Sequence, residues 1–537
     1  MSNKAINQIN IPEIESFPTI PTPFKMRNWK QVAIDYDNFV FNWNPIDQDF
    51  PVIFRDLTND TFKIPSYYGD ERINKDGGQD SLSSMGSIIG ATLAGIDKSN
   101  QDGWNYVDEM KKYYWDKYGI CGPNVDFGDG AWNTHWYTLF TNVLFYQLAD
   151  LYPSMNVDSE LKSIADKVYD MVITLGGANA DFNHQGFDFD KMEPRDNRWK
   201  EPDAAAATAV IEYWAYKKFG CQKYLHAAKW SLDFLERIDY NPYYEILLNE
   251  AGYIAARMNS EEGTRYDTCK YINWQLSTTS AVRRWGTVNG DNGNWYGYDA
   301  YGLGSGPIDY CEQYAFMMNS VYPAARYVPM VRYDHRYARA VGKWVLHIAN
   351  NTRIFYADEW CETNQSYPQY RNTREKVIAY EGLRKSYEGI KMFASGDPSV
   401  FRKQWKLGPN CTDLGIYGGG FVGFLGGIVS STNDDKILQL DCVKTDFFKS
   451  EPAYPTYLYY NPHNEEKQIE INLDAESDLF DSISGMYLER KVSGKVYFSI
   501  KADSPVLLVV TPSGGNIKYS GNRTLIDNVT VAFASCT

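Results

Sequence analysis

The chain has 537 residues, of which 44% are hydrophobic and 15% aromatic, and its 53 basic and 68 acidic residues give a net charge of −15. This length exceeds one ordinary core, so we expect two or more domains or a repeat architecture. The negative charge disfavours nucleic acid and anionic membranes as partners, and no segment approaches the roughly eighteen apolar residues of a membrane span.

The N-terminal segment, residues 1–30, is punctuated by proline and predicts an irregular arm packed on the surface. It contains no apolar signal segment, which favours a cytoplasmic protein, with a secreted or periplasmic location open if a signal was removed. The eight cysteines are far apart and lack metal-binding spacing, which favours reduced thiols. We therefore expect neither a metal nor a cofactor.

From residue 79 a pattern repeats, in which a nearly all-apolar helix is followed, after a turn, by an amphipathic helix with one charged face. Asp80 is placed to cap the first apolar helix. The apolar helices are expected at 80–96, 132–153, 201–220, 244–259 and 309–327, the last interrupted near Pro323. Their amphipathic partners are expected at 102–119, 158–177, 222–238, 263–276 and 334–351.

Helices that are apolar on nearly all faces are buried, whereas those with one charged face lie at the surface. Their strict alternation therefore predicts concentric inner and outer helical layers. A sixth, less regular unit includes 374–393 and the Gly-rich stretch 417–429, whose small side chains allow a close approach to the first inner helix. Six pairs predict a closed (α/α)6 toroid, because neither end shows a polar capping repeat.

The periodicity changes after about residue 440. Short β-branched or aromatic runs bounded by Gly, Pro, Asn and Asp predict strands of an antiparallel sandwich. These runs are 454–462, 467–474, 485–492, 495–502, 505–512 and 528–534. The expected organisation is an arm over 1–30, a mainly α toroid over 31–440 and a smaller antiparallel β-sandwich over 441–537.

A helical ring with acidic, aromatic loops and a C-terminal sandwich resembles the six-hairpin carbohydrate-active enzymes, which include glycoside hydrolases and polysaccharide lyases. The segments RYDHRYARAVGKWVLHIAN and DLGIYGGGFVGFLGGI look like those of bacterial proteins of this shape. The resemblance implies a fold more than a reaction, because one fold hosts many chemistries. It also implies a substrate cleft at the mouth of the toroid, on the loops that lead into the inner helices.

Glycoside hydrolysis needs two carboxyl groups flanking the scissile bond, one of them protonated near neutral pH. Glu201 is the first candidate for the acid, because it precedes an all-alanine helical turn and has Asp203 beside it to raise its pKa by like-charge repulsion. The alternative is that this acid–Pro–acid sequence is ordinary helix capping. Asp129, in the loop just before Trp132 and Trp136, is a further catalytic candidate.

The stretch NGDNGNWYGYDAYGLGSG is rich in glycine and aromatic residues, and it supplies Asp299 as the second carboxylate. Aromatic faces stack on sugar rings while a nearby carboxylate does the chemistry. The alternative is a packed loop whose aspartate caps a turn. The predicted substrate-binding platforms are Trp132, Trp136, Trp295, Tyr296, Tyr298 and Trp360.

The favoured function is a glycoside hydrolase that acts on an oligo- or polysaccharide with a carboxylate pair. A polysaccharide lyase is the second candidate, because His135, Tyr137, Asn183 and His184 would supply a base and neutralising groups. A non-catalytic glycan-binding protein with the same aromatic cleft is the third. The sequence specifies neither the sugar, the linkage and the stereochemistry nor the oligomeric state.

Overall fold

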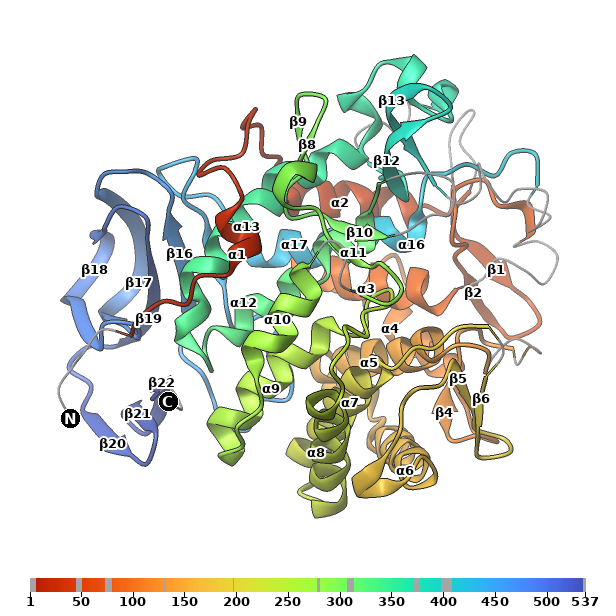
Figure 1. The fold of residues 1–537 in the computed structure, drawn as a ribbon, viewed down its shortest axis with the longest axis horizontal. Helices are drawn as coiled ribbons and strands as arrows, with labels where there is room; N and C mark the ends of the chain where they lie inside the picture. Colours follow the sequence, from red (N-terminus) through yellow and green to blue (C-terminus); the bar gives the residue numbers. More distant parts are fainter. Residues whose placement is uncertain are drawn as a thin grey trace.

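The computed structural model describes residues 6–44, 51–72, 80–126, 128, 132–196, 198–277, 281–306, 313–370, 377–396 and 408–534. The chain is mainly helical as far as residue 428 and ends in antiparallel sheet, as predicted (Figure 1). No helix in these ranges is long and apolar enough to cross a membrane.

Most of the predicted inner helices are present and almost completely buried. They are α3 Ser81–Ala94, α5 His135–Leu151, α7 Ala204–Phe219, α9 Asn249–Glu262, and the split pair α11 Met317–Val321 and α12 Ala324–Met330. The predicted break near Pro323 is confirmed, because this residue is the N-cap of α12. Asp80 caps α3 as expected, by accepting a hydrogen bond from the backbone N–H of Leu82.

Four of the predicted outer helices are present, as α6 Asp158–Thr174, α8 Gln222–Arg237, α10 Thr268–Leu276 and α13 Ala338–Asn351. A further long helix, α2 Trp29–Val40, was not predicted. A helix over 102–119 is wrong, because only α4 Tyr106–Glu109 and one 3-10 turn form before a hairpin of β3 Tyr114–Trp115 and β4 Ile120–Cys121. The aromatic run favours strand, and the ring of Trp115 lies over Gly122, where a Cβ would clash at 2.0 Å.

A helix within 374–393 is also wrong, since the described part of this segment is the hairpin β12 Gly382–Tyr387 and β13 Ile390–Ser395. Glu388 and Gly389 both have positive φ at its turn, a geometry that favours a tight hairpin over a helix. The hairpin extends a sheet formed by β7 Gly286–Thr287, β10 Gly304–Gly306 and β11 Tyr314–Phe316. The outer partner of the sixth inner helix is instead α2, from the N-terminal region.

That sixth inner helix is formed by α16 Ile416–Gly419 and α17 Val422–Ile428. A Cβ on Gly423 would lie 2.2 Å from the carbonyl oxygen of Gly90 in α3, so the two helices meet backbone to backbone. The predicted close approach of 417–429 to the first inner helix is therefore confirmed. Each inner helix contacts the next, and α17 contacts both α12 and α3, so the contacts return to their starting point.

The C-terminal ends of the inner helices are closed by the segment 446–448. Arg257, in the last turns of α9, donates hydrogen bonds to the backbone oxygens of Phe447 at 2.7 Å and Phe448 at 2.6 Å. Asp446 accepts from the hydroxyls of Tyr253 and Tyr333 at 2.7 and 2.9 Å. The N-terminal ends of the inner helices form the opposite end of the ring, which we call its mouth.

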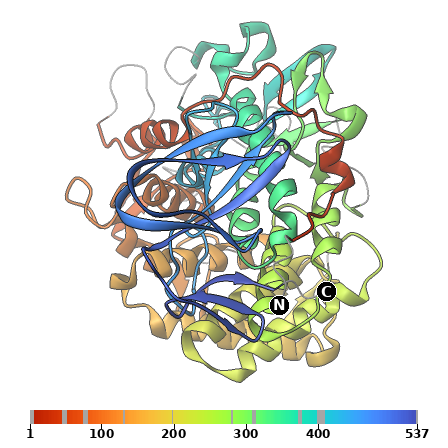
Figure 2. The same ribbon diagram turned by 90° about the vertical axis from the view of Figure 1, so that its left-hand side faces the viewer.

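Two antiparallel sheets follow, and they pack against the helical part (Figure 2). The larger has the order β14-β15-β16-β19-β17-β18, formed by Val429–Ser430, Gln439–Asp441, Thr456–Asn461, Ser504–Pro512, Lys467–Asp481 and Met486–Ile500. The smaller contains β20 Ile517–Ser520, β21 Arg523–Ile526 and β22 Val529–Phe533. The first strands of the larger sheet thus precede residue 441, and the runs 485–492 and 495–502 are one continuous strand.

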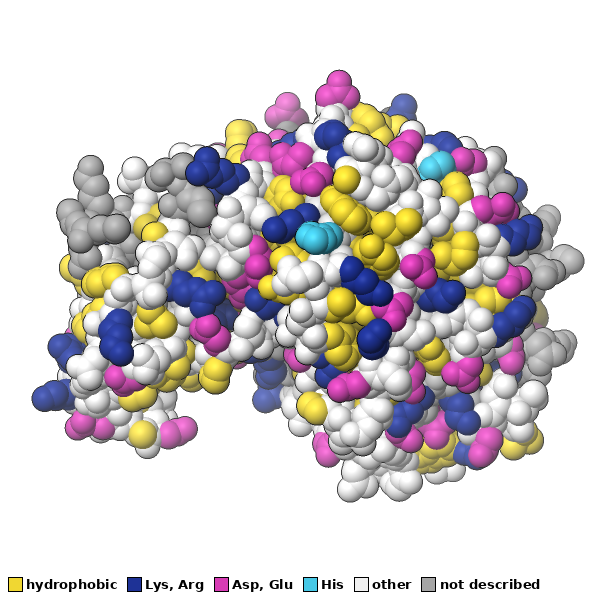
Figure 3. Space-filling view, turned by 90° about the horizontal axis from the view of Figure 1, so that it is seen from below, with side chains coloured by type: hydrophobic (Ala, Val, Ile, Leu, Met, Phe, Trp, Pro, Cys, Tyr) yellow, Lys and Arg dark blue, Asp and Glu magenta, His cyan; other side chains and the backbone are white. Residues whose placement is uncertain are grey.

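The larger sheet meets the helices through α13, which contacts β16 and β19. A Cβ on Gly342 of α13 would lie 2.5 Å from that of Tyr460, so helix and strand are in close contact. In Figure 1 the two C-terminal sheets lie at the left and the hairpin of β12 and β13 lies at the upper right, with helices between them. On the face seen in Figure 3, acidic and basic side chains are interspersed without a field of one sign.

Candidate active site at the mouth of the helical ring

Glu201 lies in the loop between the hairpin β5 Gly186–Asp188 and β6 Glu193–Arg195 and the start of α7, and its side chain is fully buried. One carboxyl oxygen accepts the backbone N–H of Trp136 at 2.9 Å, and the other accepts the indole N–H of Trp199 at 2.7 Å. Glu201 therefore satisfies a donor in the first turn of α5 rather than in its own helix. Burial outweighs these hydrogen bonds and raises its pKa to about 8.

Asp203 stands at the N-cap position of α7, yet its side chain makes no capping hydrogen bond there. One carboxyl oxygen accepts the backbone N–H of Tyr244 at 3.1 Å. The other is buried without a hydrogen-bond partner among the described residues, a position that a protonated group or a substrate hydroxyl would satisfy. Burial and then the neighbouring Glu201 raise the pKa of Asp203 well above its usual value.

The groups around the pair do not neutralise it. His135 is buried beside it, and burial lowers the pKa of its imidazole to about 3, so this histidine is uncharged at neutral pH. The guanidinium of Arg283 lies 5.1 Å from the ring of Trp199 and 5.2 Å from that of Tyr244. Its charge lowers the pKa of Glu201 less than burial raises it. The pair therefore keeps a carboxylic proton at pH 7, which is what a general acid requires.

The raised pKa of Glu201 predicts that folding stability depends on pH. The folded state retains the proton above the pKa of an unfolded glutamate, so the free energy of unfolding falls as pH rises from about 4.5 to about 8. The loss attributable to Glu201 is no more than ~5 kcal/mol, at about 1.4 kcal/mol per pKa unit. Urea unfolding at pH 5, 6, 7 and 8 should show a flatter dependence for Glu201→Gln than for wild type, and equal slopes would contradict the buried acid.

Aromatic rings form a continuous arc that begins beside Glu201. Successive ring centroids lie 5.7–6.1 Å apart through Trp199, Tyr244, Trp285, Phe316, Tyr417 and Tyr67. Beyond the half-buried Trp199, each ring retains 4–7% exposure, whereas Phe140 and Phe421, deeper in the ring of helices, retain none. The arc therefore lies nearer the surface than Phe140 and Phe421, although its rings are themselves buried.

Another buried carboxyl group, that of Glu381, lies at the other end of the arc. Glu381 accepts hydrogen bonds from the hydroxyl of Tyr67 at 3.3 Å and from that of Tyr417. Asp80 lies nearby at the start of α3 and accepts from the hydroxyl of Ser66 at 2.9 Å, and its pKa is raised by burial. The arc thus has acidic groups at both ends and rings between them, an arrangement suited to a neutral, polyhydroxylated ligand.

The structure places Asp299 elsewhere, at the end of the hairpin β8 Asn294–Trp295 and β9 Tyr298–Asp299. It accepts hydrogen bonds from the side-chain amide of Asn351 at 2.9 Å and from the backbone of Tyr301 and Thr22. These partners belong to α13, the N-terminal segment and the hairpin itself, and none belongs to the mouth. Glu201 and Asp299 are therefore not brought together as a pair, because Asp299 holds its own turn and joins it to the outer layer.

The predicted platforms divide between the two places. Trp136 adjoins Glu201 through its backbone, and Trp132 is buried under the same loop against the rings of Trp115, Tyr118 and Phe189. The others accompany Asp299: Trp295 is fully buried, Tyr296 is exposed at the hairpin turn, and Tyr298 packs on Trp360 at 4.7 Å. Asp129 lies outside the described residues.

Sequence reasoning missed most of the arc, namely Tyr67, Tyr244, Trp285, Phe316 and Tyr417, and it also missed Glu381. Tyr244 and Phe316 each precede an inner helix, and this position could have identified them as residues of the mouth. In a chain with 42 Tyr, 26 Phe and 15 Trp, aromatic character alone did not single them out.

No protein-family profile matches the sequence, and no curated protein matches it. Among solved structures, the chain is similar to a family 76 glycoside hydrolase from a bovine Bacteroides thetaiotaomicron strain, with 10% identity, 75% of this chain and 77% of that chain covered, and a TM-score of 0.43. A family 76 mannosidase from Bacteroides thetaiotaomicron gives 10% identity over 75% and 97% of the chains, with a TM-score of 0.41.

A family 127 β-L-arabinofuranosidase from Geobacillus stearothermophilus T6 covers 94% of this chain and 84% of its own at 10% identity, with a TM-score of 0.38. At this identity, and with TM-scores below 0.5, these likenesses assign no reaction.

Proposed function

We propose that this chain is a glycoside hydrolase whose catalytic domain is an (α/α)6 toroid followed by a β-sandwich. The observation that carries the proposal is the buried Glu201, whose carboxyl pKa lies at about 8 beside Asp203 at the start of an aromatic arc. The contact between α17 and α3 at Gly423 and Gly90 completes the circle of contacts between inner helices, which supports the toroid.

In the proposed reaction Glu201 is the general acid. Its proton passes to the glycosidic oxygen as the bond to the anomeric carbon breaks, and the leaving sugar departs as a neutral alcohol. Asp203 is proposed as the second carboxyl group, which takes the proton from the attacking water once it is ionised. The two groups are coupled, so ionisation of both is unfavourable and the pair retains one proton, which the proposal places on Glu201 when substrate is bound.

The substrate is proposed to be a neutral oligo- or polysaccharide. The rings of Tyr244, Trp285 and Phe316, which pack on one another, are proposed to contact the sugar rings. Arg283 is the cation whose charge acts on the pKa of Glu201. The net charge of −15 also disfavours a polyanion. A uronate polymer, and with it the lyase reaction, is less well supported.

Product analysis tests the proposal. The protein should release reducing ends from at least one member of a panel of neutral glycans, which includes mannosides and arabinofuranosides because enzymes with those names are among the similar structures. Uronate polymers belong to the same panel, since elimination creates a carbon–carbon double bond detected by ultraviolet absorbance. Binding without turnover on every glycan would overturn the hydrolase and favour a glycan-binding protein.

A further inference from the structure

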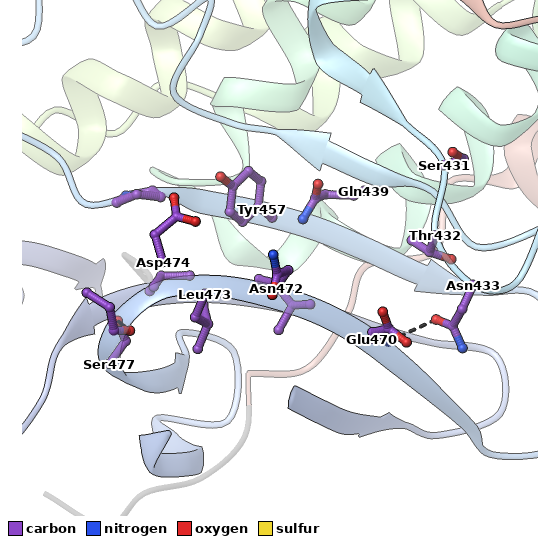
Figure 4. A pocket seen from close by; sticks show the side chains of 14 residues that line it. Ser431, Thr432, Asn433, Gln439, Tyr457, Glu470, Asn472, Leu473, Asp474 and Ser477 are labelled. Carbon is purple, nitrogen blue, oxygen red and sulfur yellow. Dashed lines mark hydrogen bonds between the residues drawn. The ribbon is translucent and has the colours of Figure 1, made fainter. Parts of the chain in front are cut away.

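A hollow lies in the larger sheet, away from the mouth of the ring, and has a volume of about 650 Å³ (Figure 4). It opens between β15 and β16 on one side and the first half of β17 on the other. Residues 467–473 of β17 pair with β18, whereas residues 477–481 also pair with β19, so the strand bends away from β16 and leaves the gap. Ligand sites commonly enclose roughly 300–1,000 Å³.

The walls of the hollow combine polar groups with a small apolar surface. The polar side chains include Ser431, Gln439, Tyr457, Asn472, Asp474 and Ser477. The apolar surface comes from Pro455, Ile471, Leu473 and Val510. Neither lysine nor arginine is among the described lining residues, so the hollow is not suited to a phosphate, a sulfate or another anion.

Several of these polar groups are available to a ligand. The side chains of Tyr457, Asn472 and Asp474 make no hydrogen bond to any other described residue, although each carries donors or acceptors. Figure 4 shows Asn472 and Asp474 rising from β17 toward the strand that carries Tyr457. Gln439 comes from the same wall and donates to the hydroxyl of Tyr459 at 2.6 Å, which fixes the orientation of its amide.

Addition of a peptide strand to the edge of β17 is disfavoured at this place. Asn433 donates its side-chain amide to the backbone oxygen of Gln468 at 2.9 Å and accepts the backbone N–H of Glu470 at 2.8 Å. The same backbone groups would otherwise pair with an incoming strand. Side chains rather than a free sheet edge are therefore what this hollow offers.

We propose that this hollow binds a short segment of a neutral saccharide as an ancillary site. We name it the sheet cleft and define it by Gln439, Tyr457, Asn472 and Asp474. Sugar hydroxyls both donate and accept, so they match amide, carboxylate and phenol groups, while the apolar wall and the ring of Tyr457 suit the C–H faces of the sugar. The inference rests on the proposed function, since an ancillary site would hold a polysaccharide near the enzyme that cleaves it.

Calorimetric titration of the full chain tests the inference, in a Glu201→Gln background so that the probe is not consumed. The probes are linear hexasaccharides of glucose, mannose, xylose, galactose and arabinose. We expect two bound molecules of at least one probe per chain. Asn472→Ala/Asp474→Ala and, separately, Tyr457→Ala should weaken one of the two sites at least about tenfold, or about 1.4 kcal/mol.

Tyr519→Ala, at an exposed residue of β20, is the matched control and should leave both sites unchanged. The Asn472→Ala/Asp474→Ala variant replaces exposed side chains, so its fold is expected to persist, and circular dichroism verifies this. An unchanged second site in both cleft variants, or no second site with any probe, overturns the inference. If the protein hydrolyses glycans but the cleft variants bind them as tightly as wild type, only the sheet cleft is refuted. If the cleft variants weaken binding but no glycan is hydrolysed, only the proposed function is refuted.

Discussion

Replacing Glu201 by glutamine should lower the rate of glycoside cleavage by about 100- to 10,000-fold, the usual contribution of a general acid. Glutamine keeps the size of the side chain and can still accept one of the hydrogen bonds from Trp136 and Trp199. What it lacks is a transferable proton. Initial rates on the substrate found in the glycan panel, measured for both proteins at pH 6, provide the test.

Two further measurements distinguish a catalytic role for Glu201 from a structural one, namely the pH dependence of kcat/KM and the response to the leaving group. In wild type, kcat/KM should fall as pH rises through about 8, because the acid then loses its proton, and this limb should be absent in Glu201→Gln. Aryl glycosides with acidic leaving groups should lose less rate than natural glycosides, since they need little proton donation. Glu193→Gln, at an exposed glutamate of β6, is the control and should behave as wild type. A Glu201→Gln protein with wild-type kcat/KM refutes the assignment.

The fold was predictable wherever helical periodicity was strong. The apolar stretches that form α3, α5, α7 and α9 are buried on nearly every face, so their apolar composition was enough to predict that they lie in the interior. Prediction failed where local geometry overrode periodicity. Residues 382–395 mix polar and apolar residues without a clear period, and the left-handed turn at Glu388 and Gly389 selects the hairpin.

The site was predictable only in part, because it depends on which loops lie close together in the folded chain. Glu201 and Asp203 were identified by their place before an inner helix. Like-charge repulsion from Asp203 was expected to raise the pKa of Glu201, whereas burial raises it in the structure and the like charge acts on Asp203. Asp299 was selected for its aromatic surroundings, which are equally those of a packed hairpin. Which loops converge is a tertiary property: Glu381 is 180 positions from Glu201 in the chain, and only the ring of helices brings their loops to the same end.

Gly423→Ala should destabilise the helical part by about 3 kcal/mol, the upper end of the usual cost of overpacking a core. The added methyl group would lie 2.2 Å from the carbonyl oxygen of Gly90 and 2.4 Å from its Cα. Both are backbone atoms, so no side-chain rotation relieves the clash, and α17 has to move away from α3. The gain in helix propensity, about 0.5–1 kcal/mol for Gly to Ala, offsets only part of this cost.

Gly418→Ala is the matched control, because it adds the same methyl group to the preceding turn of the same inner helix. There the nearest atom would be Cβ of Met317 at 3.5 Å, an ordinary van der Waals contact, so stability should change little or rise slightly. Urea unfolding midpoints separate the two variants. Because α17 is the element that returns the inner-helix contacts to α3, the Gly423→Ala protein should also lose glycoside cleavage before it unfolds globally, as Tyr417 and Glu381 shift relative to Glu201. Equal midpoints for the two variants would mean that the ring closes without this backbone contact.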